Sequence, residues 1–229
     1  MENIISDIRY IDYPSFSNER ASLLKNSLLE KGVEEIYSFG KVEIGTDRAI
    51  GKGNTSIIFL GKLKNKKVTI KIERSDSERK GSLKKEARYL IKANQHGVGP
   101  KIYGYEDNYI IMEYVEGNQL IEGGFDREDI FDITRQCNAL DRAKINHRQI
   151  QGGKHIICGK KNVIIDFEKA HLSNTPKNVT SFLSMCFLSD CLVRERVKEI
   201  FDFEEEFIKT LLKDYKYNCD IEELINNIQ

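Results

Sequence analysis

The stretch Ala49–Lys71, AIGKGNTSIIFLGKLKNKKVTIK, decides how the rest of the chain can fold. Near its start stand Gly51 and Gly53, whose missing Cβ atoms let a bulky polar group approach the backbone. An apolar strand pattern resumes at Ile57–Leu60, so the segment predicts a β-hairpin and not a loop that opens into a helix. This excludes the dinucleotide fingerprint and the P-loop, because both need a helix directly after the glycines.

The strand that follows the hairpin carries a lysine on one of its two faces. Its apolar side chains share one face: Val68, Ile70 and Ile72. Thr69 and Lys71 alternate with them and lie on the other face. Lys71 interrupts an apolar strand, whereas the lysines of the preceding turn are expected to be solvated. A lysine on the strand after a glycine hairpin is placed to bind the phosphates of a nucleotide held under the glycines.

Composition and charge restrict the class of protein. The 229 residues are 40% hydrophobic and 31% charged, which indicates a soluble globular chain with a sizeable core. Because 36 basic and 36 acidic side chains cancel, we expect no general nucleic-acid or membrane binding, although that balance leaves room for a local basic patch. No apolar window approaches a membrane span, the N-terminus does not read as a signal peptide, and no cysteines form C-x-x-C. These features favour a cytoplasmic protein with reduced thiols.

The first 115 residues are predicted to be rich in strands. Residues 1–39 are expected to form an N-terminal helical extension, with a helix over Glu19–Lys31. Residues 40–115 alternate strand patterns with one helix, Ser82–Asn94, whose apolar positions recur at helical spacing. Glu86 lies beside that apolar stripe, from where it could reach back to Lys71. The composition of residues 40–115 therefore indicates a β-rich N-lobe.

The remaining residues, 116–229, are predicted to be mainly helical. Asp126 is a suitable cap for a helix over Arg127–Ala143. Two short strand patterns follow, and the second ends at Asp166. The whole chain therefore predicts an α+β fold with an antiparallel β-rich N-lobe and a reduced, mainly helical C-lobe.

Five motifs in the correct order resemble the protein-kinase superfamily, and most closely its small microbial members, the RIO-like and predicted archaeal serine/threonine kinases. The resembling segments are the glycine-rich loop Ile50-Gly51-x-Gly53-x-x-Ser56-x-Ile58, the strand lysine Lys71, its helix-borne partner Glu86, the hinge Ile111–Gly117 and the metal-binding Ile165-Asp166-Phe167. Together they span over half of the chain. The resemblance implies a two-lobed protein-kinase-like fold.

The resemblance also implies ATP and Mg²⁺ as cofactors. Lys71 would bind the α- and β-phosphates and be held by Glu86, and Asp166 would bind Mg²⁺. The implied nucleotide-binding residues are Ile50, Gly51, Gly53, Ser56, Ile58, Thr69, Lys71, Met112, Glu113, Val115 and Lys154. Within this set Met112 resembles the gatekeeper, and the backbone of Glu113 and Val115 would face adenine.

The catalytic loop departs from the kinase pattern H-R-D-x-x-x-x-N. In His147-Arg148-Gln149 a glutamine stands where kinases carry aspartate, and it cannot accept a proton although it could orient an acceptor hydroxyl. Lys154 or His155 occupies the position of the asparagine that binds the second metal. Lys154 is therefore expected to act as a cation near the phosphates.

A carboxylate replaces the glycine of Asp-Phe-Gly. Our hypothesis is that Glu168 assists metal binding or proton removal; the alternative is a surface acid paired with Lys169. Asp141, Glu168 and His147 are the groups that could substitute for the missing base. Loss of a general base typically slows a reaction by about 10²–10⁴-fold without abolishing it.

The sequence leaves four functions to compare. The first is an atypical kinase that phosphorylates serine or threonine of a protein, or of itself, although no Ala-Pro-Glu or long activation segment follows Asp166. The second is an ATP-binding pseudokinase that acts as a scaffold or switch, which Gln149 favours. The third, a small-molecule phosphotransferase, is favoured least because such enzymes normally keep the catalytic aspartate. A pure interaction module is hard to reconcile with Lys71, Glu86 and Asp166 together.

Overall fold

The structure is a computed structural model that describes residues 3–228, and it divides into two compact units. The first contains the residues up to Arg88 together with Lys101–Tyr114, and the second contains Tyr89–Pro100 and the chain from Val115 onward. Helix α2 (Ser82–Asn94) continues from the first unit into the second. The last boundary falls next to Val115, where the sequence predicts the end of the β-rich lobe.

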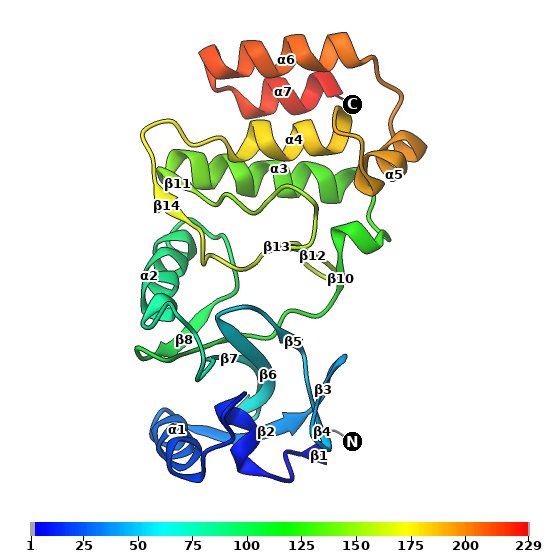
Figure 1. Ribbon diagram of the computed structural model, residues 1–229. Helices are drawn as coiled ribbons and strands as arrows, with labels where there is room; N and C mark the ends of the chain where they lie inside the picture. Colours follow the sequence, from blue (N-terminus) through cyan, green and yellow to red (C-terminus); the bar gives the residue numbers. More distant parts are fainter. Residues whose placement is uncertain (1–2, 229) are drawn as a thin grey trace. The chain divides into compact units, whose positions relative to one another are not determined.

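The first unit is built on an antiparallel sheet with the strand order β1-β2-β6-β7-β9-β8, in which β5 also pairs with β6 (Figure 1). The strands are β1 (Asn3–Ile4), β2 (Val33–Ser38), β5 (Gly51–Lys52), β6 (Ser56–Leu63), β7 (Lys66–Glu73), β8 (Ile102–Tyr105) and β9 (Tyr109–Glu113). A separate two-stranded ribbon is formed by β3 (Val42–Ile44) and β4 (Asp47–Ala49).

Helices cover both faces of this sheet. On one face α1 (Asn18–Glu30) buries Leu24 and Leu28 in the same core as Ile70 of β7. The Ser17 hydroxyl caps α1 by accepting the Arg20 N–H. The first turns of α2 cover the other face, where their apolar side chains pack on Ile110 of β9. Leucines four residues apart form the continuous apolar stripe that a helix needs to lie on a sheet.

Residues 3–38 belong to the β-rich unit and are not a separate helical extension. The helix expected over Glu19–Lys31 is present as α1, but β1 and β2 of this segment are strands of the main sheet. The short 3₁₀ helix η1 (Ile8–Asp12) contributes the fully buried Ile11 to the core. Helix α1 could be predicted because its sequence pattern is local. The pairing of β2 with β6 could not, because it joins residues that are far apart along the chain.

The second unit is mainly helical. Its helices are α3 (Arg127–Arg142), α4 (Asn178–Phe187), α5 (Leu192–Ile200), α6 (Glu205–Asn218) and α7 (Ile221–Ile228), with the 3₁₀ helix η2 (Leu120–Glu122). Two small sheets complete it, β10-β12-β13 and β11-β14, made of β10 (Asn118–Gln119), β11 (Ile145–Asn146), β12 (Ile156–Cys158), β13 (Val163–Ile164) and β14 (His171–Leu172). Helix α3 packs on α4, and α4 contacts α5 and α6 (Figure 1).

The predicted α+β fold, with an antiparallel β-rich unit and a mainly helical one, is confirmed. The first unit contains, in order, the glycine hairpin, the lysine strand β7, helix α2 and the hinge strand β9, which is the arrangement of a protein-kinase-like fold. In the second unit Asp126 caps α3 as predicted, with a reciprocal capping box to Asp129. Within residues 3–228, no helix combines the length and the apolar character that a membrane span requires.

Candidate functional site

Lys71 and Glu86 form a buried ion pair in the first unit. The Lys71 Nζ lies 2.8 Å from both carboxylate oxygens of Glu86, and the two side chains are 5% and 2% exposed. Helix α2 holds Glu86 in place because its neighbours Leu83 and Ala87 pack on the sheet. The pairing predicted from the sequence is confirmed. A buried charge pair is costly to assemble, so its presence at this sheet points to a function for the lysine.

The predicted nucleotide-binding residues of three strands share one face of the sheet. Lys71 lies directly opposite Ile58 of β6, and Thr69 lies opposite Met112 of β9. Residues directly opposite each other in antiparallel strands point to the same side, so all four side chains lie on the face that α2 partly covers. Ile58, Thr69 and Met112 stay half-buried, whereas Ile110, under α2, is fully buried. The structure thus gathers these residues beside the lysine.

The glycines of the β5–β6 hairpin are not needed by the hairpin itself. Neither Gly51 nor Gly53 has a positive φ. A Cβ on Gly51 would meet Ile58 at 3.7 Å, and a Cβ on Gly53 would meet the Ser56 carbonyl oxygen at 3.7 Å, which are ordinary contacts. By contrast, a Cβ on Gly61 would come within 2.4 Å of Ile70. The two hairpin glycines therefore keep the space over the loop free without being required by its backbone.

Ser56 closes the hairpin. Its carbonyl oxygen accepts the Gly53 N–H at 2.8 Å, and the residue is 3% exposed. The sequence predicted Ser56 as part of the nucleotide-binding loop, and the structure places it as the buried first residue of β6. Ile50 is fixed in the same way, since its N–H donates to the Ile58 carbonyl at 2.8 Å.

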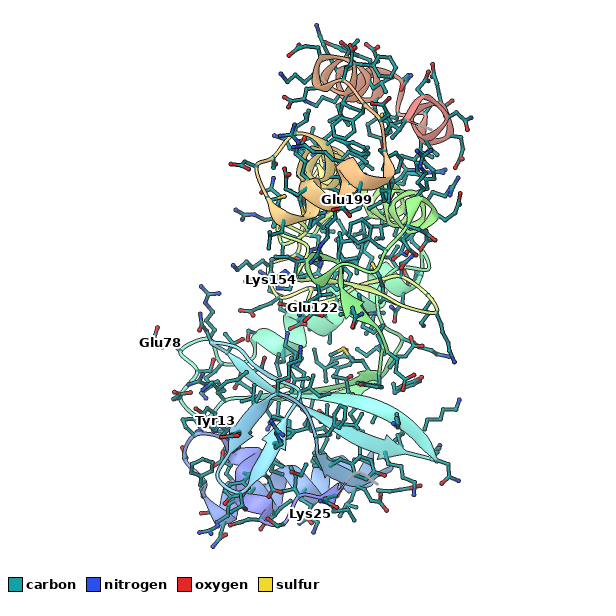
Figure 2. All side chains as sticks on the ribbon, turned by 90° about the vertical axis from the view of Figure 1, so that its right-hand side faces the viewer. Tyr13, Lys25, Glu78, Glu122, Lys154 and Glu199 are labelled. Atoms are coloured by element: carbon teal, nitrogen blue, oxygen red, sulfur yellow. The ribbon has the colours of Figure 1, made fainter. Side chains whose placement is uncertain are left out.

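The N-terminal segment braces the hairpin from outside. Arg74 donates from Nη1 to the Gly53 carbonyl at 2.8 Å, and its guanidinium lies 5.1 Å from the ring centre of Tyr13, labelled in Figure 2. The Nζ of Lys52 lies 5.4 Å from the centre of the same ring. This contact could not be predicted from the sequence, because Tyr13 is far from the hairpin along the chain.

The predicted hinge begins at the end of β9. The Glu113 N–H donates to the Lys101 carbonyl at 2.8 Å, and the Glu113 carboxylate accepts the Lys101 N–H at 3.2 Å. The N–H of Glu113 is therefore engaged within the sheet and is not available to an adenine ring. Val115 is half-buried and opens the main segment of the second unit.

In the second unit, His147 anchors the loop that resembles the catalytic loop. It is fully buried, its N–H donates to the Asn178 Oδ1 at 2.9 Å, and its Nε2 lies 3.0 Å from the Ile165 carbonyl. Because a carbonyl can only accept, Nε2 carries the hydrogen, and Nδ1 accepts the Gln149 N–H at 3.3 Å. The ring also stands edge-on to Phe167 at 4.8 Å.

Burial decides the charge of His147. It lowers the pKa of the imidazole from 6.5 to about 4, against the smaller opposing effect of the Asp166 charge. Both ring nitrogens of His147 form hydrogen bonds and its side chain is fully buried, so His147 fastens the loop of Gln149 to Ile165, which directly follows β13. The expectation that His147 could substitute for the missing base is therefore corrected to a positioning role.

Asp141 is likewise part of the framework. Its carboxylate accepts the backbone N–H groups of Asn178 at 2.9 Å and Val179 at 3.2 Å, at the first turn of α4. It also accepts the Asn178 Nδ2 at 2.6 Å, and the same amide nitrogen donates to the Ile145 carbonyl. Burial raises the pKa of the Asp141 carboxyl, and these hydrogen bonds oppose that shift. Asp141 thus caps α4 and fixes Asn178, and its oxygens are not free to serve as a base.

Asp166 lies at the centre of the polar groups in the second unit. Its Oδ2 accepts the Gln149 Nε2 at 3.3 Å and lies 3.3 Å from the His155 Nε2. The other end of the Gln149 amide accepts the Lys169 N–H at 3.2 Å. Asp166 has a φ of 66° and Arg148 one of 67°, which non-glycine residues rarely adopt. Such backbone conformations cluster at functional sites.

Of the two residues that the sequence interpretation offered at the position of the kinase asparagine, Lys154 and His155, it is His155 that contacts Asp166. Its Nδ1 lies 2.9 Å from the Gln149 carbonyl and its Nε2 faces Asp166, whereas Lys154, labelled in Figure 2, is exposed. The sequence contained a signal for this role of His155. Ile156 and Cys158 are apolar and buried, and because side chains alternate along a strand, His155 points to the side opposite Ile156. His155 is thus the residue at this position that reaches the aspartate.

The fit to a magnesium ion rests on Asp166. Among residues 3–228, no group of three or more His, Cys, Asp or Glu side chains could enclose a metal ion alone. Mg²⁺ usually keeps several waters and binds proteins through one or two carboxylates plus substrate phosphates, so a half-exposed aspartate suits it. Glu168 is half-buried next to Phe167, and its part in metal binding stays a prediction.

Comparisons with known proteins assign the chain to a family. No family model matches it. It is 34% identical over 116 residues to an uncharacterized protein of Methanocaldococcus jannaschii, in an alignment that covers 46% of this chain and 98% of that protein. The chain therefore belongs to the same family as this archaeal protein.

Two further similarities involve kinases. The chain is 30% identical over 122 residues to the probable ethanolamine kinase B of Dictyostelium discoideum, covering 52% of this chain but 26% of that protein. A crystal structure of a kinase domain matches 56% of this chain and 51% of its own, with 20% identity and a TM-score of 0.44. The chain thus spans about a quarter of the Dictyostelium protein and about half of the crystallised domain.

The buried neutral His147 makes stability depend on pH. Its folded pKa of about 4 lies below the value of 6.5 expected unfolded, so the unfolded chain binds the proton first as pH falls. The contribution is complete above pH 6.5 and is lost progressively between pH 6.5 and 4, to a total of about 3 kcal/mol. Urea unfolding at stepped pH values should show this slope, and the slope should shrink in a His147→Gln variant. An unchanged slope in that variant would assign the effect to other groups.

Proposed function

We propose that the protein is an ATP-dependent phosphotransferase of the protein-kinase type. The observation that carries this proposal is the buried Lys71–Glu86 pair, on a sheet face beside a glycine hairpin whose loop is kept free of side chains. Phosphoryl transfer asks a protein for positioning and charge neutralisation and for little covalent chemistry. A fixed ammonium group next to an open backbone loop supplies both. The five free cysteines suit a reducing compartment such as the cytoplasm.

Each part of the proposed site has a distinct task. The backbone of Gly51 and Gly53 covers the phosphates, and Lys71 binds them while Glu86 prevents the lysine from turning away. Ile58, Thr69 and Met112 supply the partly apolar face for the base, as supported by their shared register. Asp166 is the proposed Mg²⁺ ligand, with Glu168 as an assistant. When bound, the ion neutralises charge on the phosphates.

The acceptor is proposed to be a serine or threonine hydroxyl of a protein, including this protein itself. The similarity to a probable ethanolamine kinase also supports a small-molecule acceptor. Incubation with γ-labelled ATP and Mg²⁺ tests the proposal and separates these cases. Label on added protein or on the chain supports the first, and label on amino alcohols, amino sugars or nucleosides supports the second. ATP binding by calorimetry without transfer to any acceptor would overturn the enzymatic proposal.

That last outcome would favour a nucleotide-binding pseudokinase. The specific observation behind it is Gln149, whose amide donates to Asp166 and accepts from the Lys169 backbone, so it cannot take a proton. A Gln149→Asp variant supplies the missing carboxylate. We expect it to retain or raise the rate, by up to the ~10²–10⁴-fold that a general base provides. Single-turnover transfer by both forms is the measurement, and a large fall in the variant would show that Gln149 itself positions the acceptor.

The glycine hairpin provides a test that separates binding from stability. A Gly53→Ala variant is expected to keep the parent's thermal stability, because its Cβ meets the Ser56 oxygen at an ordinary 3.7 Å. It should nevertheless bind ATP at least several-fold more weakly, because the methyl group occupies space over the loop. The matched control is Gly61→Ala, whose Cβ would clash with Ile70 and which should lower the stability. Unchanged ATP affinity in Gly53→Ala would argue against a phosphate-covering loop.

A further inference from the structure

Two adjoining cavities of the second unit are lined by exposed basic side chains. The smaller, of about 270 Å³, contains Arg148 and Lys177, and the larger, of about 450 Å³, contains Arg142, Lys144, Lys177 and Lys216. Because Lys177 lines both, the cavities meet at the start of α4. We call the surface formed by Arg142, Lys144, Arg148, Lys177 and Lys216 the basic groove. All five of these residues are exposed.

Five cations of the basic groove outnumber the single carboxylate beside them, Asp141, whose charge interacts with that of Lys144. In the described part of the chain, none of the five forms an ion pair. Of the carboxylates described, Asp141 alone lines either cavity, and its oxygens accept N–H groups of Asn178 and Val179. The chain as a whole has zero formal charge, so this concentration of unpaired cations is a local feature.

The remaining lining groups suit an anion and not a cation. Most of the other lining side chains are neutral hydrogen-bonding groups: Asn146, Gln151, Asn178 and Ser181 in the smaller cavity, and Asn138, Asn174, Thr175 and Thr180 in the larger. An ammonium ligand would need a free carboxylate or an open aromatic face. The one aromatic residue here, Tyr215, is buried and donates its hydroxyl to Asn138. Lysine, arginine, amide and hydroxyl groups are the usual partners of phosphate oxygens.

We propose that the basic groove binds a small molecule carrying two or more linked phosphate groups. One phosphate lies at Lys177 and Arg148 in the smaller cavity, and the next extends toward Lys216 in the larger. The cavity volumes suit a small ligand. The site is separate from the proposed nucleotide site, because none of its five cations belongs to that set.

The basic groove adjoins the loop that carries Gln149. Arg148 directly precedes Gln149, yet the Gln149 side chain contacts Asp166 while Arg148 lines the smaller cavity. Asn178, which lines the same cavity, accepts the His147 N–H and donates to Asp141. A phosphate bound at Arg148 and Lys177 therefore contacts residues next to those that fix the loop. This position suits an effector or an acceptor that carries its own phosphates.

Calorimetric titration with sodium tripolyphosphate, without Mg²⁺ and at low salt, tests the proposal. To exclude binding in the first unit, it is run on the wild type and on a Lys71→Met/Glu86→Leu variant, which replaces the buried pair by apolar side chains. We expect binding in both, weakened about tenfold or more by Lys177→Gln and by Lys216→Gln, since each removes a charge-assisted contact. Lys213→Gln, an exposed lysine of α6 that lines neither cavity, is the matched control and should bind as the parent does.

Three results would overturn the proposal. They are no tripolyphosphate binding, equal losses in Lys177→Gln and Lys213→Gln, or binding of single-stranded oligonucleotide but not of tripolyphosphate. Inorganic phosphate adds a further check, because Lys216→Gln should weaken tripolyphosphate binding more than orthophosphate binding. Thermal unfolding of each variant confirms that it is folded. Failure of ATP binding by the wild type would leave these expectations intact, so the two proposals fail independently.

Discussion

The Lys71→Met variant is expected to lose phosphate transfer entirely and to be less stable by about 3–5 kcal/mol. The loss of transfer follows from removing the ammonium group that binds the nucleotide phosphates. The loss of stability follows from Glu86, which is 2% exposed and would remain buried without its partner at 2.8 Å. Urea unfolding and transfer from γ-labelled ATP are the two measurements.

A second variant separates these two effects. In Lys71→Met/Glu86→Leu no buried charge is left unpaired, so most of the lost stability should return, because replacing a buried pair by apolar groups is often neutral or stabilising. Activity should not return. If the double variant regained transfer, or if Lys71→Met transferred phosphate at the parental rate, the pair would be structural and the proposed nucleotide site would be wrong.

The parts of the fold that the sequence predicted well are those fixed by local patterns. Alternation along Val68–Ile72 placed Lys71 on the correct face, and helical spacing in Ser82–Asn94 placed Glu86 within reach of it. The cap Asp126 predicted the start of α3, and the expected start of α1 at Glu19 was one residue from the observed Asn18. Such signals depend on neighbours within a few positions, so the sequence alone contains them.

The roles that the sequence could not predict depend on tertiary burial. His147 and Asp141 look like free titratable groups in the sequence, but contacts with Asn178 and Ile165 engage them in the framework. Lys154 was preferred to His155 because counting along a motif ignores which side of a strand a residue faces. The basic groove could not be predicted from the sequence either, because its five cations come from three separate segments, 142–148 and the neighbourhoods of Lys177 and Lys216, that the fold brings together.

The Asp166→Asn variant is expected to transfer phosphate at least about 10²–10³-fold more slowly, the loss typical for removing one charge-stabilising group. Its fold should be unaffected, because asparagine tolerates the φ of 66° and can still accept the Gln149 amide. Asp166→Ala should lose activity and also about 1–2 kcal/mol of stability, because alanine resists that conformation. Single-turnover transfer and urea unfolding report the two quantities.

The companion variant Glu168→Gln decides how far the metal site extends. If Glu168 also binds Mg²⁺, its variant should need more Mg²⁺ for half-maximal transfer, as Asp166→Asn should. If Glu168 is a surface acid, the Mg²⁺ dependence of the Glu168→Gln variant should match that of the parent. The ion would then be bound by Asp166, water and phosphate oxygens. Parental rates and Mg²⁺ dependence in Asp166→Asn would contradict the proposed role of Asp166, because its contacts His155 and Gln149 offer no carboxylate to replace it and Glu168 is tested by its own variant.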